Sequence, residues 1–201
     1  PAGNIADRHV HADYLDAAGL ARLSSIARAA TTEFENVPAA ALEFLARTAR
    51  VSPAAATVAI AQDRIREKGF LADHGFAVAP YAVLATARDT AAVDASLVPG
   101  IVKSARFGYD GKGQTRVTTT GEVATAFRAM GNVPCVLERF VDLACEVSVI
   151  VARDAAGATT TWPVAENRHR DGILDVSIAP ARVAPGLADQ ARAVATRVAA
   201  A

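Results

Sequence analysis

The chain has 201 residues, 52% hydrophobic and 21% charged, so it can bury one large core or two small ones. Its 21 Lys and Arg residues balance 21 Asp and Glu residues, which excludes the general positive charge that nucleic acids and acidic membranes attract. Because no apolar stretch approaches the ~20 residues of a membrane span and no signal-peptide pattern opens the chain, we expect a cytoplasmic globular protein without a nucleic-acid or membrane partner.

The first 80 residues alternate short strands with helices. Pro38 is favoured at the start of a helix, and Gly75 is favoured just after the end of one. Strands that alternate with helices favour a parallel sheet covered on both faces, so we expect a partial N-terminal parallel α/β domain. We expect strands at 8–11 and 31–36, and helices within 15–30, 38–45, 54–61 and 62–74.

The remaining residues indicate an α+β domain that follows the α/β domain. We expect a small lid subdomain at about 81–135 and a larger subdomain from about 136, with a hairpin turn at 154–157. Both domains are expected to be incomplete, since the chain opens on Pro1 and closes within a helical stretch. The expected elements are strands at 81–85, 100–103, 115–117, 135–138, 146–151 and 159–163, and helices at 89–95, 122–130 and 187–201.

Two cysteines, Cys135 and Cys145, match neither a zinc-site spacing nor a disulfide framework. Apolar residues neighbour both of them. We therefore expect two buried thiols in a reducing compartment.

The stretch RFGYDGKGQ, residues 106–114, places three glycines beside two cations and one acid. Its glycines allow positive φ angles and a close approach of the backbone, and successive amides in such a loop can bind phosphate oxygens. The spacing matches neither the Walker A motif nor the dinucleotide fingerprint. From the residues alone, the stretch is either a phosphate-binding loop or a β-hairpin with Asp110 and Gly111 at its tip.

Charged residues mark the ends of the strands near this loop. Lys103 ends an apolar strand, where its ammonium needs either water or an anionic partner such as a nucleotide phosphate. Glu138 ends another strand, and Glu146 begins the next. Taken singly, such acids are often solvated strand edges, so the pattern leaves a structural and a ligand-binding interpretation open.

Taken together, these residues resemble the ATP-grasp enzymes. The resemblance rests on Lys103, the 108–114 loop, the 138–141 strand end, Glu146 and ENRHRDGILDVSIAPA at 166–181. Within that superfamily, the combination of GYDGKGQ with NRHRDGIL is similar to the biotin-independent synthases that make 5-(carboxyamino)imidazole ribonucleotide. The upstream stretches TTEFENVP and AQDRIREK match the same family in the same order, so the resemblance covers nearly the whole chain.

The resemblance implies ATP as a cofactor and assigns residues to it. In the family, the residues that match Arg64 and Lys103 contact ATP. The glycine loop closes over the phosphates, and the 138–141 strand end holds the adenine edge. The acid that matches Glu146 reaches the ribose hydroxyls, and the histidine that matches His169 lies near the nucleotide. The implied ATP-binding residues are Arg64, Lys103, Gly108, Tyr109, Asp110, Gly111, Lys112, Gly113, Gln114, Glu138, Arg139, Phe140, Val141, Glu146 and His169.

The same resemblance implies a binding site for 5-aminoimidazole ribonucleotide. Tyr109, Asp110 and Lys112 would meet this substrate from the glycine loop, and Glu33 or Glu35 would approach it from the first domain. Asp110 would accept a proton from the amine, which makes Asp110 and Lys112 the candidate catalytic residues. Asp110 also fits the role of a turn-forming residue. Family members carry Arg or Lys where Lys112 stands, and a lysine lacks the bidentate fork of an arginine.

The implied reaction is an ATP-driven carboxylation. Bicarbonate attacks the γ-phosphate to give carboxyphosphate and ADP, the anhydride releases carbon dioxide and phosphate, and the exocyclic amine captures the carbon dioxide. A glycine-loop lid would exclude water from the anhydride. The resemblance also implies a homodimer and Mg²⁺. The carboxylates that bind Mg²⁺ in the family are expected outside this chain segment, so we expect the segment alone to be inactive.

Three alternatives stay open at this point. A formate-using glycinamide ribonucleotide transformylase shares the ATP-grasp core, although GYDGKGQ followed by HRDGIL fits it less well. A biotin carboxylase also uses bicarbonate. A non-catalytic nucleotide-binding module could keep the fold without the chemistry.

Overall fold

The computed structural model describes residues 2–108, 113–170 and 172–201. The chain divides into two compact units, Pro1–Glu67 and Lys68–Ala201, and each is described by itself. This division falls before the boundary near residue 80 that the sequence pattern suggests. The reason is that helix α4 (Arg64–Asp73) crosses the division, and from Lys68 onward it belongs to the second unit, where the Lys68 ammonium meets Glu138.

The first unit is built from short helices and two very short strands. Strands β1 and β2 pair in parallel, with Ala29 opposite Arg50 and Ala30 opposite Val51. A small core forms between α2 and α3, where Leu42 and Val58 are buried. The elements are η1 (Ala2–Asn4), α1 (Ala17–Ile26), β1 (Ala29–Ala30), α2 (Ala39–Leu45), β2 (Arg50–Val51) and α3 (Ala55–Ala61).

The helices of the first unit agree with the sequence pattern, but its strands do not. The strand expected at 8–11 is irregular, and the strand expected at 31–36 is replaced by β1 just before it. The Ser52 amide still donates to the Ala30 carbonyl at 3.0 Å, but Pro53 has no N–H with which to continue the pairing. The two-stranded pairing therefore stops there.

The second unit contains two antiparallel sheets and a separate hairpin. The larger sheet has the strand order β3-β6-β4-β5, the smaller sheet has the order β11-β10-β7, and β8 pairs with β9. The elements are β3 (Tyr81–Leu84), η2 (Asp89–Ala91), η3 (Ala95–Leu97), β4 (Gly100–Ser104), β5 (Gln114–Val117), α5 (Thr120–Ala129), β6 (Cys135–Arg139), β7 (Glu146–Ser148), β8 (Val151–Arg153), β9 (Thr159–Thr161), β10 (Ala165–Arg170), β11 (Ile173–Ile178) and α6 (Pro185–Ala200).

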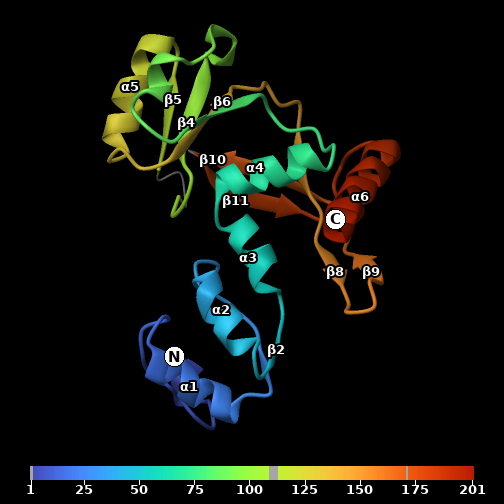
Figure 1. Ribbon diagram of the computed structural model, residues 1–201. Helices are drawn as coiled ribbons and strands as arrows, with labels where there is room; N and C mark the ends of the chain where they lie inside the picture. Colours follow the sequence, from blue (N-terminus) through green and yellow to red (C-terminus); the bar gives the residue numbers. More distant parts are fainter. Residues whose placement is uncertain (1, 109–112, 171) are drawn as a thin grey trace. The chain divides into compact units, whose positions relative to one another are not determined.

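Helix α5 covers one face of the four-stranded sheet (Figure 1). Apolar side chains of α5, of η3 and of that sheet face form the main core of the unit: Leu84, Leu97, Val102, Val117, Val123, Ala126, Phe127, Cys135 and Leu137. Because side chains alternate along a strand, the residues between these core positions point to the opposite face. That opposite face carries Tyr81, Lys103, Gln114, Arg116 and Glu138.

Three expectations for the second unit are corrected by the structure. The single strand expected at 146–151 is divided into β7, which joins the three-stranded sheet, and β8, which joins the hairpin. The helix expected at 89–95 is instead the two 3₁₀ turns η2 and η3, because the Asp89 and Asp94 carboxylates accept hydrogen bonds from nearby backbone amides. Cys135 is buried as expected, but Cys145 is exposed because it lies in the irregular segment before β7.

The four-stranded sheet also extends past the expected lid boundary. Strand β6 pairs with β3 and β4 through Arg139, so the residues after 135 complete the same sheet as the residues before it. Glu138 and Lys103 therefore share one sheet.

The last helix, α6, packs beside the β8–β9 hairpin (Figure 1). The Arg153 guanidinium donates to the Ala199 carbonyl at 2.9 Å, and the Arg197 guanidinium lies over the Phe76 ring. None of the helices in the described part of the chain is long and apolar enough to cross a membrane.

Candidate functional site

Lys103 and Glu138 form an ion pair on the face of the four-stranded sheet that lies opposite α5. Val136 lies opposite Lys103 in the ladder, and Glu138 lies two residues further along the same strand, so the two side chains are diagonal neighbours on one face. The Lys103 Nζ donates to Glu138 Oε2 at 2.9 Å. The cation and the acid that the sequence marks as strand ends are thus in direct contact.

A second lysine, which we did not select from the sequence, completes this cluster. Lys68 of α4 places its Nζ 3.2 Å from Glu138 Oε1 and 5.2 Å from the centre of the Tyr81 ring. Lys68 belongs to the AQDRIREK stretch, but a lysine among the charges of a helix is ordinarily solvated. Only the packing of α4 shows that this one is not.

The two lysines determine the charge state of the acid. Burial raises the pKa of Glu138, but the hydrogen bond and charge of Lys103, together with those of Lys68, outweigh burial and hold the pKa below its ordinary value. Glu138 is therefore a carboxylate at neutral pH. We call Lys68, Lys103 and Glu138 the two-lysine cluster.

The glycine loop begins and ends beside the strand that carries Lys103. The Ser104 amide donates to the Gly113 carbonyl at 2.8 Å. Gly113 has a φ of 70°, and a Cβ there would lie 2.6 Å from Ser104 Oγ and 3.3 Å from the Gly108 Cα, so only glycine fits. Gln114 then opens β5 opposite Lys103. The remaining loop residues assigned from the sequence, Tyr109, Asp110, Gly111 and Lys112, lie outside the described residues.

The end of β6 uses part of its backbone to hold the fold. The Arg139 amide donates to the Pro80 carbonyl and the Phe140 amide donates to the Pro99 carbonyl, both at 2.8 Å. A purine edge at this segment would therefore have to meet other main-chain groups. The Phe140 and Val141 side chains are partly exposed, and the Arg116 guanidinium lies 4.1 Å from the centre of the Phe140 ring.

Glu146 and His169 meet on the three-stranded sheet. Asn167 lies opposite Glu146, and His169 lies two residues beyond Asn167, so this pair is again diagonal on one sheet face. His169 Nδ1 lies 3.4 Å from Glu146 Oε2, and both side chains are partly exposed. Ser177 on the same face donates to the Asn167 side-chain oxygen at 2.9 Å, which orders the polar surface next to the pair.

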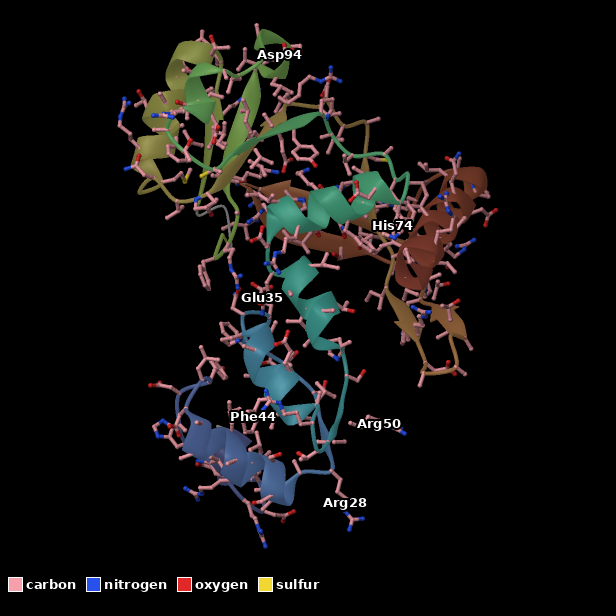
Figure 2. All side chains as sticks on the ribbon, in the orientation of Figure 1. Arg28, Glu35, Phe44, Arg50, His74 and Asp94 are labelled. Atoms are coloured by element: carbon pink, nitrogen blue, oxygen red, sulfur yellow. The ribbon has the colours of Figure 1, made fainter. Side chains whose placement is uncertain are left out.

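The candidate residues of the first unit lie in different surroundings. Glu33 lines a hollow of about 490 Å³ together with Arg8, Tyr14 and Phe34. Glu35 does not line this hollow. It lies in the turn that precedes α2 (Figure 2), where its backbone carbonyl accepts a hydrogen bond from the Gln62 side-chain amide at 2.6 Å. Of the two acids, Glu33 is the one whose position suits a ligand.

Arg64 opens helix α4. The Asp63 carboxylate accepts a hydrogen bond from the Ile65 amide at 3.0 Å and so stabilises the start of the helix. Arg64 belongs to the first unit, whereas the other candidate ATP-binding residues belong to the second.

The described residues do not fit a magnesium site. Within the described ranges, no three or more acids, histidines and cysteines gather as a metal site would require. Mg²⁺ bound to nucleotide phosphates needs one or two well-placed carboxylates, and Glu138 is already occupied by two lysines. No chemical step is therefore assigned to a metal held by these residues.

The two sheets together offer a chemistry suited to an anionic, hydroxyl-bearing ligand. Lysines bind phosphate oxygens by charge and hydrogen bonds, and a carboxylate beside a histidine can accept hydrogen bonds from a diol. The two-lysine cluster and the Glu146–His169 pair lie in the same compact unit.

Comparison with known proteins shows what this chain is similar to. A family model of the ATP-grasp domain matches residues 69–201, and a model of the ribonucleotide synthetase preATP-grasp domain matches residues 1–62. N5-carboxyaminoimidazole ribonucleotide synthase from Brucella melitensis biotype 1 is 42% identical over 201 residues, covering 98% of this chain and 56% of the relative. The protein of the same name from Bacillus subtilis (strain 168) is 36% identical over 200 residues, covering 99% and 53%.

A solved structure agrees with these relatives. The ADP complex of an N5-carboxyaminoimidazole ribonucleotide synthetase superposes with a TM-score of 0.89 at 34% identity, covering 98% of this chain and 52% of that chain. The chain thus spans about half the length of the curated relatives it matches.

Proposed function

The chain belongs to the ATP-grasp family, and we propose that the full-length gene product carrying it is an ATP-dependent carbon–nitrogen ligase of purine biosynthesis. Its reaction joins bicarbonate to 5-aminoimidazole ribonucleotide and gives 5-(carboxyamino)imidazole ribonucleotide, ADP and phosphate. One observation carries the proposal. The relatives from Brucella melitensis and Bacillus subtilis are both named N5-carboxyaminoimidazole ribonucleotide synthase, and they align with nearly the whole chain.

The second unit supplies the groups that would hold ATP. Lys103 lies on the face of the four-stranded sheet opposite α5, near the ends of the glycine loop, where its ammonium can meet phosphate oxygens. Glu138 and the segment that follows it can meet the adenine edge. Glu146, paired with His169, can accept hydrogen bonds from the ribose hydroxyls.

The proposed reaction has three steps. A bicarbonate oxygen forms a bond to the γ-phosphorus while the bond from that phosphorus to the bridging oxygen breaks, which gives carboxyphosphate and ADP. Carboxyphosphate then breaks down to carbon dioxide and phosphate, and the exocyclic amine attacks the carbon dioxide and loses a proton. Asp110 is our candidate acceptor for that proton.

Water must be kept out while carboxyphosphate is present, because water would hydrolyse this anhydride. The loop of residues 108–114, with Lys112 and Tyr109 on it, is our candidate lid. In the first unit, Glu33 is preferred over Glu35 as the acid that meets the ribonucleotide, because only Glu33 lines the hollow.

Four finer features belong to the same proposal. The use of bicarbonate, the requirement for Mg²⁺ and the homodimeric assembly come from the family resemblance, and the cytoplasmic location is the expectation drawn from the sequence pattern. Magnesium would neutralise developing charge on the phosphates once carboxylates outside the described cluster hold it.

The test is ADP release by the full-length gene product with Mg-ATP and bicarbonate, with and without 5-aminoimidazole ribonucleotide. We expect ADP release to depend strongly on the ribonucleotide. Two controls separate the alternatives: formate in place of bicarbonate would support a transformylase, and free biotin in place of the ribonucleotide would support a biotin carboxylase. ADP release that ignores the ribonucleotide, or nucleotide binding without turnover, would contradict the proposal.

A further inference from the structure

The two-lysine cluster holds more positive charge than its acid can neutralise. Lys68, Lys103 and Glu138 keep only 12%, 24% and 15% of their side-chain surface exposed. Two ammonium groups and one carboxylate leave a net charge of +1 where water is scarce. Such a site favours the arrival of a further anion.

Each oxygen of Glu138 serves a different lysine. Oε1 faces Lys68 at 3.2 Å, and Oε2 accepts from Lys103 at 2.9 Å. The carboxylate can therefore lose one partner and still keep the other. Lysine suits such an exchange, since its ammonium is a point charge on a flexible chain without the fixed fork of an arginine.

The two lysines differ in how easily each can be released from Glu138. Lys103 is the more exposed lysine, and its strand leads towards the glycine loop. Lys68 is the more buried lysine, extends from a helix, and has its ammonium against the Tyr81 ring at 5.2 Å. An incoming phosphate can thus reach Lys103 more easily than it can reach Lys68.

We propose that Lys68 is a positioning residue that holds Glu138 in place while Lys103 exchanges this carboxylate for a nucleotide phosphate. The proposal rests on the ATP-binding function proposed above. Without Lys68, both oxygens of Glu138 would be left to Lys103. The phosphate would then compete for Lys103 with a carboxylate that has no other partner. The negative charge of Glu138 would also repel the phosphate.

A purely structural role for Lys68 makes a different prediction. If Lys68 only docks α4 on the sheet, its loss should weaken nucleotide binding whether or not residue 138 is charged. If Lys68 acts through Glu138, its loss should matter only while Glu138 is a carboxylate. A double-mutant cycle between the two residues separates these roles.

The experiment measures the Kd of a non-hydrolysable ATP analogue by calorimetry on the full-length gene product. The variants are Lys68→Met, Glu138→Gln, the double variant of both, and Lys68→Arg. Arg66→Met is the matched control, because Arg66 is an exposed cation on the same helix. Lys68→Gln replaces Lys68→Met if the latter does not fold, and a melting curve checks each variant.

We expect Lys68→Met to raise the Kd about tenfold, the size of one charge-assisted hydrogen bond. Lys68→Arg should restore the Kd to within about threefold of the wild type, because it keeps the charge. Arg66→Met should leave the Kd unchanged. In steady-state assays, Lys68→Met should raise the KM for ATP more than it lowers kcat.

The cycle gives the deciding result. Adding Lys68→Met to Glu138→Gln should change the Kd by less than about twofold. An undiminished tenfold effect in that background, or no effect of Lys68→Met alone, overturns this inference while leaving the proposed function intact. Failure of the wild type to bind the analogue overturns both.

Discussion

The four-stranded and three-stranded sheets of the second unit each hold a carboxylate between two cations, but the cations differ in kind and in exposure. Glu138 on β6 lies between two largely buried lysines. Glu166 on β10 lies between Arg168 and Arg182, and Arg182 is 54% exposed. The Arg182 guanidinium donates to both oxygens of Glu166, at 2.8 and 3.0 Å.

This difference means that Glu138 can exchange its ion-pair partners, whereas Glu166 is held in one geometry. A bidentate arginine fixes a carboxylate by geometry, so the Arg182–Glu166 pair ties the segment after β11 back to β10. Two lysines on separate oxygens leave the carboxylate a choice of partners. The sheet that offers this choice is also the sheet whose other face is packed under α5, so a rigid core supports an adaptable charged surface.

The largest expected effect tests the packed face of the four-stranded sheet. Phe127→Ala should lower the free energy of unfolding by about 3–5 kcal/mol, because the ring is fully buried between α5 and the sheet. Val176→Ala on the three-stranded sheet is the matched change, and we expect it to cost about 1 kcal/mol or less because Val176 is 41% exposed. Chemical denaturation of the full-length gene product measures both. Equal losses would contradict the contrast between the sheets.

The next effect compares the two carboxylates. Glu138→Gln should lower the free energy of unfolding by about 2 kcal/mol, because it leaves two largely buried lysines without an anion. Glu166→Gln should produce a smaller loss, since water can solvate the arginines that it releases. Denaturant midpoints of the two variants test the order, and the prediction is wrong if Glu166→Gln proves the more damaging.

The two carboxylates should also respond to acid in the same direction. Hydrogen bonds and charge from Arg182, opposed by desolvation and helped by Arg168, lower the pKa of Glu166 to about 2. The pKa of Glu138 is also lowered. Both folded-state pKa values lie below the unfolded value of about 4.3, so the stabilisation is complete above that pH and is lost as pH falls through the folded-state values.

A carbon-13 NMR titration of the side-chain carboxyls measures this response. We expect the Glu166 signal to titrate near pH 2 and to move towards its ordinary value in Arg182→Gln. The Glu138 signal should not move in that variant, because its partners are Lys103 and Lys68. If the titration midpoint of Glu166 does not change in Arg182→Gln, then Arg182 is not the cause of the lowered pKa.

The smallest effect on stability is expected for the Glu146–His169 pair. Glu146→Gln should change the free energy of unfolding by less than about 0.5 kcal/mol, because this pair is long at 3.4 Å and partly exposed. If Glu146 meets the ribose, the same variant should raise the Kd for ATP about tenfold. Calorimetry and denaturation on one preparation separate the two effects, and a loss of stability without a loss of affinity would assign Glu146 to the fold.

Much of the secondary structure follows from local signals along the chain. The helix that begins after Pro38 and the helix that ends before Gly75 are present, and so are the strands around Lys103 and Glu138. The hairpin turn at 154–157 is present as well, with the Asp154 carboxylate accepting from the Ala156 and Ala158 amides. Each of these depends on neighbours within a few residues.

The strands that the sequence misplaced depend on partners elsewhere. The 31–36 stretch alternates as a strand does, but Pro53 ends the pairing that could have extended it. The 146–151 stretch reads as one strand because β-branched residues run through it, yet its first part pairs with β10 and its end pairs with β9. Cys145 has apolar neighbours in sequence, but it is exposed.

The sequence by itself determined the type of most helices and strands, the balanced charge, and the motifs by which the chain resembles an ATP-grasp enzyme. Only the tertiary structure decided that Lys103 reaches Glu138, that Glu146 reaches His169, and that Lys68 joins the first of these pairs. The physical reason is that propensities and turns act over a few residues, whereas strand register and helix packing bring together groups that are far apart in the chain. The two-lysine cluster, whose members come from α4, β4 and β6, exists only once that register and that packing are in place.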